Sequence, residues 1–203
     1  MIRCVVLILS FLLQSPLAAS AGYEEGAAAI MRGDYAAGLS ELRPAAEKGD
    51  VRAQVLLGDM YREQLGVRRD DSLAAFWYRK AAELGWAPAQ AQLGHLYRRG
   101  EGVLQSHVEA AKWYRKAAEQ NLTVGQVSLG ATYYHGLGLA RDYVQAHVWF
   151  TLALSGISVR DADLALARKG IAQAEAEMSP EQIKEAKRLA QSWTLPAPTQ
   201  QAE

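Results

Sequence analysis

The heptapeptide WYRKAAE stands at residues 77–83 and again at residues 113–119. Seven identical residues at a spacing of 36 positions indicate an internal repeat. Repeats of about this length are typical of solenoids and related architectures. The fold therefore depends on what else recurs at the same spacing.

Further residues recur with this period in three copies. Leucine–glycine pairs, tyrosines, loop glycines, alanines and tryptophans all align: Leu57-Gly58, Leu93-Gly94 and Leu129-Gly130; Tyr61, Tyr97 and Tyr133; Gly66, Gly102 and Gly138; Ala74, Ala110 and Ala146; Trp77, Trp113 and Trp149. Three units result, at residues 51–86, 87–122 and 123–158. Because the tryptophans follow the repeat period, we expect them in the core.

Each unit carries the pattern of two helices. In the middle unit, Ala89, Leu93 and Tyr97 recur every four residues and form one stripe of a helix. The glycine-containing segment at residues 100–103 ends this helix, and residues 108–119 form a second helix with an apolar face. Neither helix can bury its face alone, so the pattern predicts an all-α protein, an α-solenoid of stacked antiparallel helix pairs.

The repeated glycine lies inside the first helix of each unit. A glycine there costs about 1 kcal/mol relative to alanine. Its recurrence as Gly58, Gly94 and Gly130 predicts that another helix approaches closely at this point. In the repeated heptapeptide, the basic pairs are expected to face mostly solvent: Arg79-Lys80 and Arg115-Lys116.

The stretch AQLGHLYRRGEGVLQSHVEAAKWYRKAAEQ at residues 91–120 resembles the Sel-one-like repeat family, a class similar to tetratricopeptide repeats. The resemblance rests on Leu-Gly-x-x-Tyr, Gly-x-Gly-Val and Trp-Tyr-x-x-Ala-Ala in this order. The other units depart from it at a few positions, such as Gln64 in the first loop. The resemblance implies a scaffolding role, since periplasmic relatives restrain sensor kinases or support envelope and exopolysaccharide assembly.

Two flanks extend the stack. Residues 45–50 align with residues 81–86, so residues 22–50 are predicted as an N-terminal cap similar to a tetratricopeptide unit, with a second helix distorted by Pro44. Residues 159–194 are predicted as C-terminal capping helices, the last of which begins at Ser179-Pro180-Glu181-Gln182 and closes the apolar end of the stack. Residues 195–203 are predicted to be a disordered tail.

The first 21 residues have the composition of a signal peptide. Arg3 precedes a largely apolar stretch at residues 5–13, which is too short to cross a membrane, and Ala19-Ser20-Ala21 fits a cleavage site. We expect a periplasmic or secreted protein that begins at Gly22 and has no stable membrane anchor. The only cysteine, Cys4, lies in this segment.

No catalytic or metal-binding motif is apparent. The four histidines do not have the spacing of metal ligands: His95, His107, His135 and His147. Neither Ser-x-x-Lys nor Gly-x-Ser-x-Gly, the motifs of active-site serines, occurs. The glycine-rich residues 136–142 repeat the loop of the preceding unit and lack the Gly-Lys-Ser/Thr of a phosphate loop. A net charge of zero disfavours nucleic-acid binding. We therefore expect no enzyme activity, no cofactor and no metal.

A candidate binding surface follows from variation between the units. At 100° per residue, a helical wheel centred on Leu93 places one set of residues on a flank beside the core stripe. Along the stack, this flank of the first helices changes from apolar to polar. This predicted strip consists of Leu56, Met60, Glu63, Gln92, Leu96, Arg99, Ser128, Thr132 and His135. The alternative is that these positions are simply unconstrained.

The sequence favours an exported, non-enzymatic scaffold or adaptor that binds a peptide or protein on its concave surface and regulates envelope or signalling components. One alternative is a protein that binds or hydrolyses peptidoglycan or β-lactams. Another is a subunit of a larger complex that needs a partner to cover its open end. Trp86, which does not recur, is a candidate for stacking on a carbohydrate.

Overall fold

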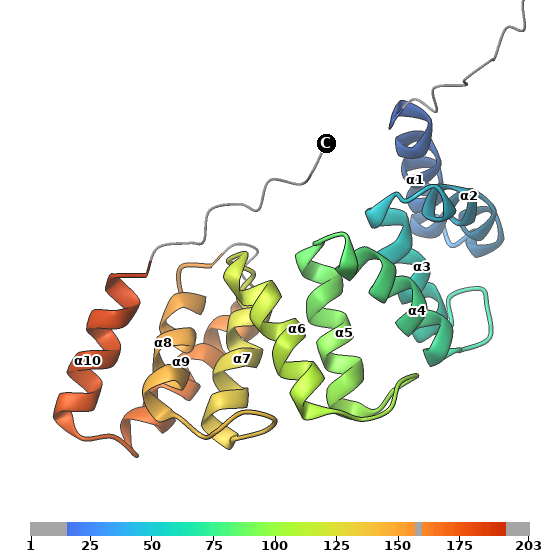
Figure 1. The fold of residues 1–203 in the computed structure, drawn as a ribbon. Coiled ribbons are helices and arrows are strands. Elements are labelled where there is room, and N and C mark those ends of the chain that lie inside the picture. Colours follow the sequence, from blue (N-terminus) through green and yellow to red (C-terminus); the bar gives the residue numbers. More distant parts are fainter. Residues whose placement is uncertain (1–15, 157–159, 194–203) are drawn as a thin grey trace, which may run out of the picture.

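The computed structural model describes residues 16–156 and 160–193, which form ten helices and no strand (Figure 1). The predicted all-α solenoid is confirmed. The helices are α1 (Pro16–Met31), α2 (Tyr35–Glu47), α3 (Val51–Glu63), α4 (Asp71–Glu83), α5 (Ala87–Arg99), α6 (His107–Glu119), α7 (Thr123–His135), α8 (Tyr143–Ala153), α9 (Asp161–Glu175) and α10 (Pro180–Gln191).

The helices pack in consecutive pairs, and each pair packs on the next through its neighbouring helix. Helices α3, α5 and α7 are the first helices of the three repeats, and α4, α6 and α8 are the second helices. The first helices α5 and α7 also touch each other directly, which places them on one side of the stack. After the third repeat, α9 packs against α7 and α8, and α10 packs against α8 (Figure 1).

The repeated glycines admit an aromatic ring from the second helix of the same repeat. A Cβ atom at Gly58 would lie 2.7 Å from the ring of Tyr78, and one at Gly94 would lie 2.6 Å from the ring of Tyr114. At Gly130 the neighbour is Phe150, at 2.8 Å. The predicted close approach is confirmed, and the approaching group is a ring rather than backbone.

The repeated tryptophans belong to the core, as predicted. Trp77 and Trp149 are buried, and Trp113 packs half-buried against the cluster that contains Tyr78 and Leu93. The ring of Trp149 meets the ring of Trp193 edge to face, with 4.7 Å between their centroids. The segment after α10 therefore covers the last repeat from outside.

The repeats are also joined by arginine–tyrosine hydrogen bonds that the sequence did not predict. Arg79 Nη2 donates to the Tyr97 hydroxyl over 2.9 Å, and Arg115 Nη2 donates to the Tyr133 hydroxyl over 2.6 Å. Both arginines are half-buried, so the prediction that they face solvent is wrong. Their long side chains reach across to the next repeat, whereas Lys80 is exposed, as expected.

A buried glutamine ties each first helix to the preceding helix. Gln54, Gln90 and Gln126 donate through Nε2 to the backbone carbonyls of Ala46, Ala82 and Ala118, at 3.0, 3.1 and 3.5 Å. These carbonyl groups lie near a helix end, and each also accepts a backbone N–H from the following turn, that of Gly49, Gly85 or Asn121. The glutamines thus belong to the frame of the solenoid.

Side chains cap the starts of several helices, including the start predicted at Ser179. Asp70, Ser106 and Asp142 cap the second helices of the three repeats through their side chains. Ser179 and Gln182 form the reciprocal capping box that starts α10. Pro44 lies inside α2 but does not end it, since the helix continues to Glu47.

Helix α1 begins at Pro16, so residues 16–21 of the predicted signal peptide are helical. The apolar stretch at 5–13, and with it Cys4, lies outside the described residues, as do 157–159 and the predicted disordered tail. No described helix has the length and apolar character needed to cross a membrane.

Candidate binding groove

An open groove of about 660 Å³ runs along the side of the stack formed by the first helices. Residues of α3, α5, α7 and α9 line it, together with residues of the loops after α3 and α5 and the residues directly before α7 and α9. Its charged side chains are four arginines and three carboxylates: Arg62, Arg69, Arg99, Arg160, Glu63, Glu101 and Asp163. Pro88, Leu122 and Val124 add apolar surface beside them.

The groove contains only part of the predicted strip. Glu63, Gln92 and Arg99 line it. Three other members of the predicted strip lie elsewhere, half-buried or exposed, and do not line the groove: Leu56, Ser128 and His135.

Met60, Leu96 and Thr132 are buried, which corrects their placement on the surface. Leu96 is fully buried in the cluster around Tyr78 and Leu93. The apolar stripe of a packed helix spans 100° or more, so a residue 60° from the centre of the stripe still faces the core. The groove side of each first helix lies further round, beyond the buried stripe.

His95 also lines the groove. Its Nδ1 lies 2.8 Å from the hydroxyl oxygen of Tyr114 on α6, and the two rings meet edge to face. Burial raises the pKa of the Tyr114 hydroxyl, so this group keeps its proton and can donate it to the imidazole. With this proton directed to Nδ1, the neutral imidazole carries its own proton on Nε2.

The surroundings of His95 keep it neutral. Burial, and after it the positive charges of four arginines, together lower the pKa of His95 to about 4: Arg98, Arg99, Arg62 and Arg160. The imidazole is therefore a neutral N–H donor near neutral pH.

The residue after the repeated glycine differs in each repeat, together with its aromatic neighbour. In the first repeat, Asp59 accepts a hydrogen bond of 2.5 Å from Tyr78, and burial raises the pKa of this carboxyl. In the third repeat, Ala131 and Phe150 stand at the corresponding positions. A hydroxyl is thus present only where the first helix offers it a polar partner. In the sequence, this difference is visible as the change of the residue that follows each Leu-Gly pair.

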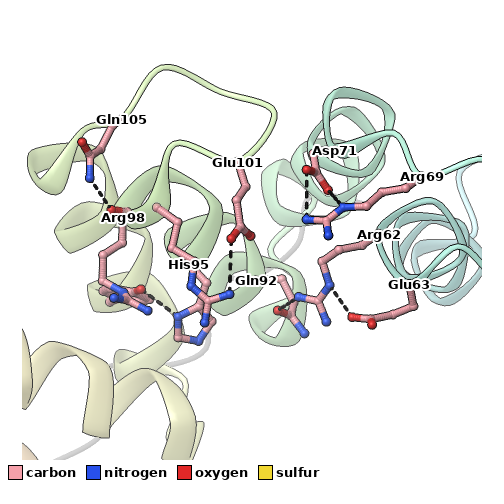
Figure 2. A network of polar contacts seen from close by, with 11 residues as sticks. Arg62, Glu63, Arg69, Asp71, Gln92, His95, Arg98, Glu101 and Gln105 are labelled. Atoms are coloured by element: carbon pink, nitrogen blue, oxygen red, sulfur yellow. Dashed lines mark hydrogen bonds and ion pairs between the residues drawn. The ribbon is translucent and has the colours of Figure 1, made fainter.

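The groove arginines differ in the length of their hydrogen bonds and ion pairs, and Figure 2 shows Arg62 with Gln92 and Glu63. Arg62 reaches from α3 to α5, where Nη1 donates to Gln92 over 2.9 Å, while Nε pairs with Glu63 at 2.9 Å. Arg160 binds Asp163 through two bonds of 2.8 and 3.1 Å. The ion pair between Arg99 and Glu101 measures 3.5 Å, and the Arg99 side chain is 53% exposed.

The histidines form no metal centre in the part of the chain that the structure describes, where no group of three or more potential ligands occurs. His147 is buried between α8 and α9, with Nε2 at 3.1 Å from Glu175 and Nδ1 at 3.3 Å from Thr151. This histidine stabilises the packing of α9 and does not line the groove.

A comparison with protein families matches the Sel1 repeat model to residues 51–86, 87–122 and 123–156. The chain belongs to the Sel1 repeat family. Sel1 repeats generally mediate protein–protein interaction, and proteins of this fold are typically non-enzymatic scaffolds.

Two solved Sel1-type structures are similar to this Sel1 repeat protein. A Sel1 repeat protein from Oxalobacter formigenes is 35% identical with a TM-score of 0.63, over 66% of this chain and 55% of that one. The protective antigen c5321 of uropathogenic Escherichia coli is 29% identical with a TM-score of 0.49, over 85% of this chain and 44% of that one. The chain thus spans about half the length of these solved proteins. No curated protein matches it.

Proposed function

We propose that this Sel1 repeat protein is an exported, non-enzymatic scaffold that binds a peptide or protein partner in the groove along α3, α5, α7 and α9. The observation that carries the proposal is the groove itself. Its lining side chains differ between repeats, whereas the residues that build the frame recur. A constant frame with a variable inner surface is how solenoids present binding sites.

The proposed place of action is the periplasm or the outside of the cell, where the protein would regulate envelope or signalling components. The composition of residues 1–21 supports export. Cell fractionation and N-terminal sequencing test this part. We expect a soluble exported protein that starts at Gly22, and an unprocessed protein in the cytoplasm would contradict export.

A capture experiment tests the groove. We would compare the wild-type protein with Arg99→Glu, which reverses a charge in the groove, and with Lys184→Glu, which makes the same change at an exposed position of α10. Each protein is incubated with an envelope extract, and bound proteins are identified by mass spectrometry. We expect Arg99→Glu alone to lose a partner. Equal recovery with all three proteins would contradict binding in the groove.

The non-enzymatic assignment has its own test. The purified protein is incubated with a fluorescent penicillin and, separately, with peptidoglycan fragments. We expect no covalent label and no cleavage. Labelling or turnover would favour the alternative of a protein that binds or hydrolyses β-lactams or peptidoglycan.

A further inference from the structure

The centre of the groove holds a directed hydrogen-bond donor. The Tyr114 hydroxyl holds the His95 ring at Nδ1, and a bond donated by this hydroxyl leaves Nε2–H as the remaining donor of the ring. Within the described residues, Nε2 has no hydrogen-bond partner, and it is not among the buried polar atoms that lack one. The donor is therefore accessible to a ligand in the groove.

Next to this donor lies the arginine that is held least firmly. The Arg62 and Arg160 guanidinium groups form bonds of 2.8–2.9 Å with neighbouring carboxylates, whereas the pair of Arg99 with Glu101 is at 3.5 Å. Exposed ion pairs contribute little to stability, so Arg99 can exchange Glu101 for a ligand at small cost. Arginine binds carboxylates with two parallel hydrogen bonds when the geometry allows.

We infer that the groove binds an acidic peptide segment and seats the carboxylate of an Asp or Glu side chain between Arg99 and the Nε2–H of His95. The inference rests on the proposed function, since it names the chemistry of the partner in the same groove. Charge complementarity favours an anion, because the arginines that line the groove outnumber its carboxylates.

The apolar lining favours a peptide over a small inorganic anion or a sugar. Pro88 on α5 and Leu122 and Val124 at the start of α7 lie in the same groove as the arginines. They offer contact surface to apolar residues that flank the acidic side chain. The expected partner segment is therefore an acidic residue next to apolar ones, in a chain that crosses the first helices.

A peptide array tests this inference. Random decapeptides are synthesised with acetylated N-termini and amidated C-termini, so that Asp and Glu side chains supply the only carboxylates. The array is probed with the wild-type protein, with Arg99→Gln, and with Arg32→Gln, a matched loss of charge at an exposed residue after α1. We expect the wild type and Arg32→Gln to select acidic peptides and Arg99→Gln to lose this preference.

Matched peptides then give the magnitude. The best binder is compared with a version in which each Asp or Glu is replaced by Asn or Gln. For the wild type, we expect the replacement to weaken binding about tenfold or more, as for the loss of a hydrogen bond between charged groups. For Arg99→Gln, we expect a much smaller difference between the two peptides. Binding should also shift the Nε2 resonance of His95 in the wild type.

The outcomes separate the two proposals. Selection of peptides without acidic residues, with binding that is lost in Arg99→Glu, would overturn the acidic-peptide inference and leave the groove as the binding site. If the array selects no peptide whose binding depends on a groove residue, both the proposed function and the acidic-peptide inference are overturned. An unchanged His95 resonance in the complex would remove His95 from the contact, and with it the proposed carboxylate seat.

Discussion

The second and third repeats share one frame but differ in what that frame supports. In the second repeat, Gly94 admits the ring of Tyr114, and the hydroxyl of that ring orients His95 toward the groove. In the third repeat, Phe150 fills the same place without a hydroxyl, and Trp149 lies under Trp193. The same packing thus serves a polar groove in one repeat and a closed apolar end in the next.

The largest effect should come from the covered tryptophan of the third repeat. Trp149 is 2% exposed, so Trp149→Ala should lower the free energy of unfolding by about 3–5 kcal/mol. Trp113 occupies the same repeat position but is half-buried, and Trp113→Ala should cost clearly less. Urea denaturation followed by circular dichroism measures both. Equal losses would show that the C-terminal segment does not cover the third repeat.

The repeated glycine gives the next effect. A Cβ atom at position 94 would lie 2.6 Å from the ring of Tyr114, so Gly94→Ala should destabilise the protein by about 1–3 kcal/mol through overpacking. Helix propensity alone predicts the opposite sign, a gain of about 1 kcal/mol. Thermal unfolding distinguishes the two. Combining Gly94→Ala with Tyr114→Leu should recover part of the loss if the ring is its cause.

The half-buried imidazole of His95 should make stability depend on pH. The folded pKa of His95 is lowered to about 4, below the value of about 6.5 for a free side chain. The unfolded chain therefore binds the proton more readily, so this contribution to stability is complete above about pH 6.5 and decreases as pH falls toward 4. His95→Gln should flatten the slope of unfolding free energy over this range. An unchanged slope would mean that His95 is not buried as described.

The smallest effect concerns two adjacent residues of the repeated heptapeptide. Arg79→Ala removes the bond to Tyr97 of the next repeat and should cost about 0.5–1.5 kcal/mol. Lys80→Ala changes an exposed residue and should stay within about 0.5 kcal/mol. Chemical denaturation of the two variants side by side measures both losses of unfolding free energy. A larger loss for Lys80→Ala would contradict the assignment of Arg79 to the frame.

The fold could be predicted because each of its determinants recurs. The 36-residue spacing, the apolar stripes, the repeated glycine and the capping box at Ser179 are all local patterns, and the structure confirms each of them. Periodicity identifies the frame because identical packing requires identical residues.

The groove could be predicted only in part, because its limits depend on tertiary packing. A helical wheel gives the angle of Leu96 but not the width of the buried stripe, and this leucine proved to be core. Likewise, the sequence does not show that Arg79 reaches the next repeat. His95 gains its significance only from Tyr114 on another helix and from the arginines around it.

Site-specific photocrosslinking tests the central claim most directly. A photoreactive amino acid is placed at position 99 in the groove or, as a control, at position 184 on the exposed surface of α10. The protein is produced in its native host, irradiated, and its crosslinked products are identified. The account predicts a defined partner protein crosslinked from position 99 and none from position 184. The same partner from both positions, or from position 184 alone, would contradict a binding site in the groove of the first helices.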